Sequence, residues 1–154
     1  MDQQNLLKKQ HQVAVLAASA MVLSVFLYGG VVFLLQRSWD TPSGPGNPVL
    51  KPAVFSGAVL NVLMIPFLKG LILKNNLSAG SEAPKNPEDW APRLFTASIL
   101  GFALSELPSI IGLALCLMTQ NARDYWPFAA LSLSAFALHF PRYSEWERRA
   151  ATLY

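Results

Sequence analysis

The chain contains 154 residues, of which 53% are hydrophobic and only 14% are charged, whereas a typical soluble domain has roughly 25% charged residues. Its formal net charge of +3 is not gathered into a basic face, which argues against a nucleic-acid partner. A single cysteine, Cys116, excludes an intrachain disulfide and a cysteine-only metal site. These features indicate one small domain whose solvent is the lipid bilayer.

The first apolar run covers residues 13–35 and contains no charge. At 1.5 Å per residue it is long enough to cross a hydrocarbon core of about 30 Å. A signal peptide is the alternative, because Lys8 and Lys9 precede the run. The apolar part of a signal peptide is only about 7–15 residues long, however. We therefore expect a retained transmembrane helix.

The second apolar run, 52–73, lies between two polar segments. Residues 38–51 are rich in proline and glycine and predict a loop, as do residues 74–93, which hold three further prolines. Pro66 is expected to kink the second helix. Lys69 stands near its end, where its amine can reach the lipid headgroups.

Two further spans are predicted at 94–119 and 125–141. The third has Glu106 as its one charged residue, and the fourth is short for a complete crossing. Tryptophans flank the predicted spans, as expected of residues at the membrane interface. These are Trp39, Trp90, Trp126 and Trp146.

The distribution of basic residues predicts the topology, because cytoplasmic flanks collect Lys and Arg. If the fourth segment crosses, only three of the 12 Lys and Arg residues lie on the opposite side, namely Arg37, Lys51 and Arg123. We therefore expect an all-α, four-helix integral membrane bundle with both termini in the cytoplasm. A bacterial inner membrane is the expected location.

Glu106 is the first candidate for a functional residue, because a charge at mid-membrane costs several kcal/mol. It must be protonated, paired or directed into a polar cavity. Ser109, one turn further on, is placed to orient the carboxyl group. Pro108 has no amide hydrogen, which predicts a kink and leaves the Leu104 carbonyl free to bind a cation or water. The alternative is a neutral Glu106 that only hydrogen-bonds another helix.

A stripe of small residues runs beside this glutamate along the third predicted helix. Small residues on one face allow helices to approach closely in lipid. We therefore expect this helix to be the packing centre, within the chain or against a partner. The stripe consists of Ala97, Gly101, Ser105, Ser109 and Gly112.

Residues 85–113 resemble the second half of the rotor-ring c subunit of rotary ATP synthases. The family's cytoplasmic polar turn corresponds to Lys85-Asn86-Pro87-Glu88, and its outer helix, with a membrane carboxylate, corresponds to the segment around Glu106. The resemblance implies that Glu106 binds H⁺ or Na⁺. It also implies that residues 85–88 lie in the cytoplasm, in agreement with the charge distribution.

The sequence contains no catalytic triad, phosphate-binding glycine loop or metal motif, so we expect no enzyme, metal or cofactor. His11 and His139 are expected to be interfacial side chains, with haem ligation as a remote alternative. The favoured hypothesis is an accessory or subunit of a larger membrane complex, with other membrane subunits or further copies of itself as partners. The alternative is a proton- or sodium-translocating rotor or transporter subunit.

Overall fold

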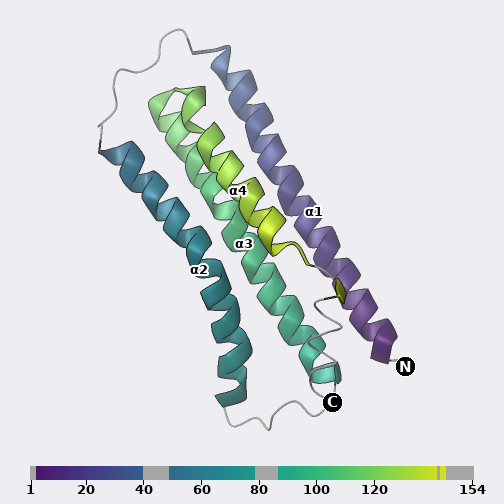
Figure 1. Ribbon diagram of the computed structural model, residues 1–154. Helices are drawn as coiled ribbons and strands as arrows, with labels where there is room; N and C mark the ends of the chain where they lie inside the picture. The colour runs from purple at the N-terminus through teal and green to yellow at the C-terminus, as the bar shows by residue number, and fades with distance from the viewer. Residues whose placement is uncertain (1–2, 40–48, 79–86, 142, 145–154) are drawn as a thin grey trace.

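The computed structural model describes residues 3–39, 49–78, 87–141 and 143–144, and this part of the chain is all-helical (Figure 1). This confirms the predicted all-α class. Within these residues there are four α-helices and one short 3-10 helix. They are α1 (Gln3–Gln36), α2 (Leu50–Ser78), α3 (Pro87–Thr119), η1 (Ala122–Asp124) and α4 (Trp126–His139).

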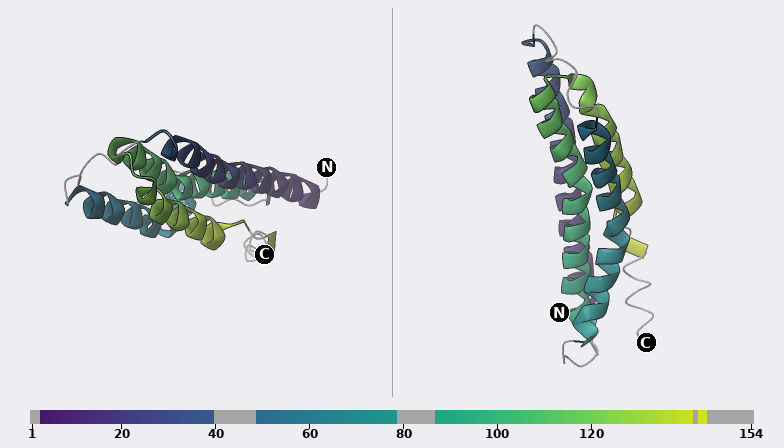
Figure 2. Two further views of the ribbon diagram at one scale, coloured as in Figure 1. Left: turned by 90° about the horizontal axis from the view of Figure 1, so that it is seen from above. Right: turned by 90° about the vertical axis from the view of Figure 1, so that its left-hand side faces the viewer.

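The helices form an elongated bundle in which α3 contacts α1, α2 and α4 (Figure 2). The turn through η1 reverses the chain, so α4 packs back against α3. Two hydrogen bonds place α4 antiparallel to α1. The Tyr125 hydroxyl donates to the Val25 carbonyl at 2.6 Å, and His11 Nε2 donates to the Pro141 carbonyl at 3.1 Å. The end of α4 therefore lies beside the beginning of α1.

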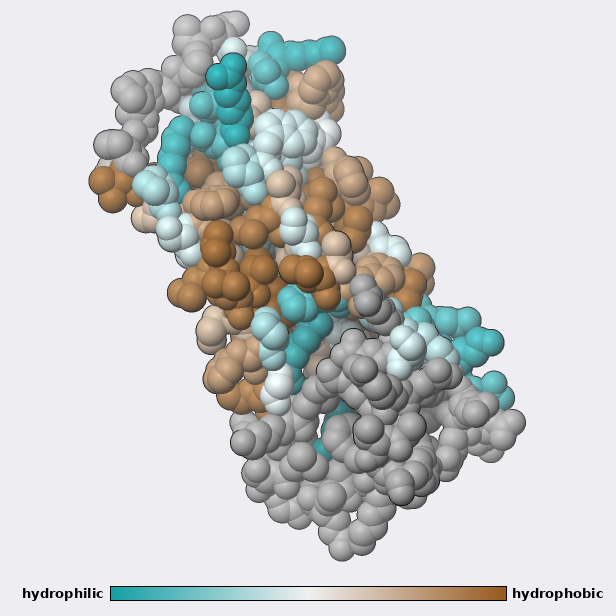
Figure 3. All heavy atoms as spheres, viewed as in Figure 1, coloured by the Kyte–Doolittle hydropathy of each residue, from teal (hydrophilic) through white to brown (hydrophobic). Residues whose placement is uncertain are grey.

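Three helices contain stretches that are long and apolar enough to cross a membrane, Lys8–Gln36, Leu50–Ile72 and Pro92–Thr119. The fourth helix has 14 residues and extends about 21 Å, so the predicted crossing at 125–141 stays a prediction. Large apolar side chains such as Leu16, Leu63 and Phe67 lie on the outside. Hydrophobic residues gather across the middle of the face shown in Figure 3, as expected of a surface in contact with lipid.

The helices extend beyond the apolar runs, so the predicted loop at 74–93 was wrong at both ends. α2 continues to Ser78 and α3 begins at Pro87. Proline is favoured in the first turn of a helix because the amide hydrogen it lacks has no intrahelical partner there. Hydropathy marks where a helix meets lipid, whereas the helix itself continues into water. Lys85 and Asn86 lie outside the described residues, and Pro87 and Glu88 belong to the first turn of α3.

An ion pair and a hydrogen bond fix the turn between α3 and α4 to the start of α2. Lys51 Nζ lies 2.7 Å from Asp124 Oδ2, and the Thr119 hydroxyl donates to the same oxygen at 2.7 Å. The Asn121 side chain accepts a hydrogen bond from the Arg123 amide. These contacts lie at the end of the bundle opposite the contact between His11 and Pro141.

Candidate functional site

Glu106 lies near the middle of the apolar part of α3, and its side chain meets α1. Glu106 Oε1 is in hydrogen-bonding contact with the hydroxyls of Ser24 and Tyr28, the latter at 3.0 Å. Ser24 and Tyr28 are four residues apart and therefore lie on the same face of α1. The sequence predicted that this carboxyl group is protonated, paired or directed into a polar cavity. The structure places it against polar side chains inside the bundle.

The hydrogen atoms at this site can be counted. Ser24 Oγ is 2.6 Å from the Met21 carbonyl oxygen, in addition to its contact with Glu106. The site therefore has three oxygen–oxygen contacts, Ser24 with Met21, Ser24 with Glu106 and Tyr28 with Glu106. Each hydroxyl supplies one hydrogen, and a carbonyl oxygen supplies none.

Both hydroxyls are placed to donate to Glu106 Oε1, and the Ser24 hydrogen is shared between that oxygen and the Met21 carbonyl. Two hydroxyl hydrogens can therefore serve all three contacts. A neutral carboxyl group, which is the form that costs least in an apolar environment, would bring a third hydrogen to the site.

Pro108 disturbs the hydrogen bonding of α3 two residues after Glu106. Because proline lacks an amide hydrogen, the carbonyl of Leu104 loses its intrahelical donor. Asn61 of α2 replaces that donor, with Nδ2 at 2.8 Å from the Leu104 oxygen. The expected free carbonyl is therefore occupied by a side chain, and the idea that it binds a cation or water is not supported by this geometry.

Ser109 makes different contacts from those expected. Its hydroxyl donates to the main-chain carbonyl of Glu106 at 2.7 Å rather than to the carboxyl group. Its amide donates to Ser132 Oγ of α4 at 2.9 Å. Ser109 thus joins α3 to α4, while Ser24 and Tyr28 orient the Glu106 carboxyl group.

One short stretch of α3 therefore forms hydrogen bonds with all three other α-helices. We call the participating residues the central polar cluster, and each of its interhelical bonds lies within the apolar part of the bundle. Polar contacts are strong constraints on helix position in lipid, where water cannot replace them. The cluster consists of Ser24, Tyr28, Asn61, Leu104, Glu106, Ser109 and Ser132.

The small-residue stripe is buried and faces neighbouring helices. An added Cβ on Gly112 would lie 2.5 Å from Phe128 Cβ of α4, so glycine permits a close approach there. At Gly101 the neighbour is the Lys69 side chain of α2. Ala97 and Ser105 are also buried, and the Ser105 hydroxyl donates to the Gly101 carbonyl at 2.7 Å.

Lys69 lies against α3 rather than extending along the helix axis to the headgroups as expected. Its carbon chain fills the space beside Gly101, and Nζ is 5.9 Å from the centroid of the Phe102 ring. Such a contact between an ammonium group and an aromatic face is attractive, and more so when water is excluded. Pro66, three residues earlier, lies within α2, which bends about midway along its length in Figure 1.

Sequence reasoning identified Glu106 but missed most of its partners. Tyr28 is a polar aromatic residue within the first apolar run. Ser24, Asn61 and Ser132 are single polar residues within apolar runs, and this is the signal that points to them. Among the described residues, no group of three or more His, Cys, Asp or Glu side chains is arranged to hold a metal ion.

Comparisons with known proteins leave the family open. The chain matches no protein-family model, and neither the curated proteins nor the solved structures compared with it give a significant match. The resemblance of residues 85–113 to a rotor-ring subunit therefore stays a prediction from the sequence. The function has to be argued from the geometry of the central polar cluster.

Proposed function

We propose that the chain is a small, non-enzymatic, multi-pass membrane protein that serves as a subunit or accessory of a larger membrane complex. In this proposal both termini are cytoplasmic, the membrane is a bacterial inner membrane, and Glu106 holds a proton inside the bundle. The observation that carries the proposal is the position of the Glu106 carboxyl group within the apolar part of the bundle, where it contacts the uncharged hydroxyls of Ser24 and Tyr28 and where a neutral carboxyl group costs least.

A carbodiimide tests the protonation of Glu106, because this reagent attacks neutral carboxyl groups in apolar surroundings. We expect modification of Glu106 in native membranes at neutral pH and none in the Glu106→Gln variant. Asp124 is the internal comparison, since it forms an ion pair with Lys51 at the end of the bundle. The absence of Glu106 labelling across the accessible pH range, with the reagent shown to enter the membrane, would contradict the proposal.

A role in a larger complex is tested by gentle extraction followed by native mass spectrometry of the intact assembly. We expect a defined stoichiometry with larger, unrelated membrane subunits. Recovery of the monomer alone, under conditions that preserve other complexes of the same membrane, would overturn the proposed role as a subunit.

The second candidate function is translocation of H⁺ or Na⁺, with Glu106 as the carrier. It is favoured by the clustering of four oxygen atoms, because carboxylate, hydroxyl and carbonyl oxygens suit a hard cation. The four are Glu106 Oε1, Ser24 Oγ, Tyr28 Oη and the Met21 carbonyl oxygen. This function predicts that Na⁺ or high pH slows carbodiimide labelling, and that native mass spectrometry finds a ring-sized homo-oligomer.

A further inference from the structure

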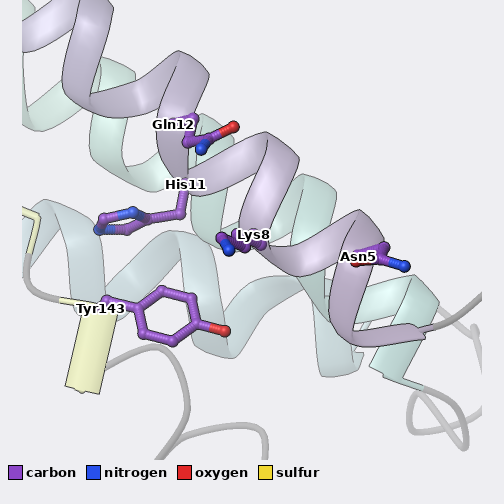
Figure 4. Close-up of a pocket in the computed structure, with 5 residues that line it drawn as sticks. All are labelled: Asn5, Lys8, His11, Gln12 and Tyr143. Carbon is purple, nitrogen blue, oxygen red and sulfur yellow. The ribbon is translucent and has the colours of Figure 1, made fainter.

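A polar pocket lies far from Glu106, between the N-terminal part of α1 and the segment that follows α4. It has a volume of about 430 Å³, within the range of about 300–1,000 Å³ that is usual for ligand sites. Figure 4 shows the His11 ring of α1 beside the Tyr143 ring, with Lys8 on the neighbouring turn of α1. The described residues that line the pocket are Asn5, Lys8, His11, Gln12 and Tyr143, and none of them is acidic.

His11 holds the segment that contains Pro141 and Tyr143, which faces α1 across the pocket. Its Nε2 donates to the Pro141 carbonyl at 3.1 Å, and its ring packs edge-on against Tyr143 with the centroids 5.2 Å apart. Because the acceptor is a carbonyl oxygen, Nε2 carries the hydrogen. The pocket is therefore built from two segments that are distant in the sequence, and it exists only while Pro141 and Tyr143 are docked on α1.

The chemistry of the lining suits an anion. The Lys8 side chain is exposed and offers a positive charge with three donors, and the amides of Asn5 and Gln12 offer further N–H donors. Donors of this kind form short, charge-assisted hydrogen bonds with phosphate oxygens. An acidic ligand is thus favoured over a neutral or cationic one.

The position of the pocket indicates where that anion comes from. Val13, directly after Gln12, begins the uncharged run that extends to residue 35, so the pocket lies where α1 leaves the hydrocarbon. Lipid phosphates lie at that depth, and basic residues just outside an apolar helix are attracted to anionic lipids. We propose that this pocket binds the phosphate group of an anionic phospholipid headgroup. The proposal does not depend on the state of Glu106.

The test compares Lys8→Gln with Lys9→Gln in the full-length protein. Lys9 is an exposed neighbour that does not line the pocket. Each substitution removes one positive charge, so the two variants have the same net charge. Binding of phosphatidylglycerol to the detergent-purified protein is measured by native mass spectrometry, with phosphatidylcholine as the neutral comparison. We expect Lys8→Gln to weaken phosphatidylglycerol binding at least about tenfold, the value of one charge-assisted hydrogen bond, and Lys9→Gln to weaken it less than about twofold.

Equal losses in the two variants would overturn the proposal, because they would show diffuse attraction to a charged surface. Tyr143→Ala provides a second check, since it opens the pocket without changing charge. Unchanged phosphatidylglycerol binding in that variant would also overturn the proposal. Inorganic phosphate is added as a competitor, and displacement of the lipid by millimolar phosphate would assign the pocket to a free anion instead of a headgroup. Circular dichroism verifies that each variant folds.

Discussion

At the scale of single residues, the contacts of Glu106 explain how a carboxyl group is accommodated within the bundle. Ser24 and Tyr28 both donate to Glu106 Oε1, and the Ser24 hydroxyl also contacts the Met21 carbonyl. A primary amide is uncharged and keeps an acceptor oxygen at this position, so it resembles a neutral carboxyl group. This similarity makes the protonation state accessible to mutation.

Glu106→Gln is expected to lower the free energy of unfolding by less than about 0.5 kcal/mol, because the amide oxygen can take the place of Glu106 Oε1 and accept from both Ser24 and Tyr28. Glu106→Ala removes both bonds and is expected to cost about 1–2 kcal/mol, given the modest value of interhelical hydrogen bonds in membranes. Unfolding in detergent, followed by circular dichroism, measures both. Ser134→Ala is the control, since that hydroxyl is exposed and donates only within α4. Equal destabilisation by Gln and Ala would show that the site requires an ionised carboxylate.

Gly112 is a second residue whose role follows from its surroundings. An alanine methyl group there would lie within 2.5–3.2 Å of three Phe128 atoms, including Cβ, which is fixed to the backbone of α4. We expect Gly112→Ala to destabilise the bundle by about 1–3 kcal/mol through overpacking. Gly57→Ala is the matched control, because nothing lies within 4 Å of the added methyl group, and helix propensity favours alanine. Thermal unfolding of the two variants in parallel checks the prediction, and equal midpoints would contradict it.

At the scale of elements, the break in α3 at Pro108 is compensated by side chains from other helices. Asn61 of α2 donates to the Leu104 carbonyl, and Ser132 of α4 accepts from the Ser109 amide. Pro108 interrupts the hydrogen bonding within α3, and Asn61 and Ser132 provide hydrogen bonds from other helices at the same place. Most of the apolar surface of α2 is exposed. Because little of that surface packs against other helices, α2 depends strongly on the hydrogen bond from Asn61 to the Leu104 carbonyl.

A double-mutant cycle measures this coupling between Asn61 and Pro108. Asn61→Ala leaves the Leu104 carbonyl without a donor and is expected to cost about 1 kcal/mol. In a Pro108→Ala background the restored amide at position 108 supplies the missing hydrogen bond, so the same Asn61→Ala change is expected to cost much less. Unfolding free energies of the wild type, both single variants and the double variant give the coupling energy. Additive effects would show that Asn61 stabilises α2 by some other contact.

Sequence patterns predicted the elements better than their contacts. Apolar runs located the parts of α1, α2 and α3 that can meet lipid, and Glu106 stood out because any charge in such a run is costly. The end of α2 and the start of α3 were wrong because hydropathy does not report how far a helix continues beyond its apolar part. The partnership of Glu106 with Ser24 and Tyr28 depends on the rotation and register of two helices, which no periodicity within either helix determines.

At the scale of the whole molecule, the two ends of the bundle are held together by different contacts. One end joins the start of α1 to the end of α4 through His11 and Pro141, and the other joins α2 to η1 through Lys51 and Asp124. If α1 crosses the membrane, as its length and composition allow, these two contacts lie on opposite sides of it. α4 extends from one toward the other, and its 14 residues extend about 21 Å, which is less than a hydrocarbon core of about 30 Å.

Cysteine labelling tests whether α4 crosses. In a Cys116→Ala background, Lys9→Cys and Ser144→Cys probe the end near His11, and Arg123→Cys probes the end near Lys51. We expect a membrane-impermeant maleimide to label Lys9→Cys and Ser144→Cys from the cytoplasmic side alone, and Arg123→Cys from the opposite side alone. If Ser144→Cys were labelled from the same side as Arg123→Cys, only three helices would cross and the pocket beside Tyr143 could not form. Labelling of all three positions after the membrane is made permeable is the control that each thiol is reactive, so that a difference in labelling reports the side of the membrane.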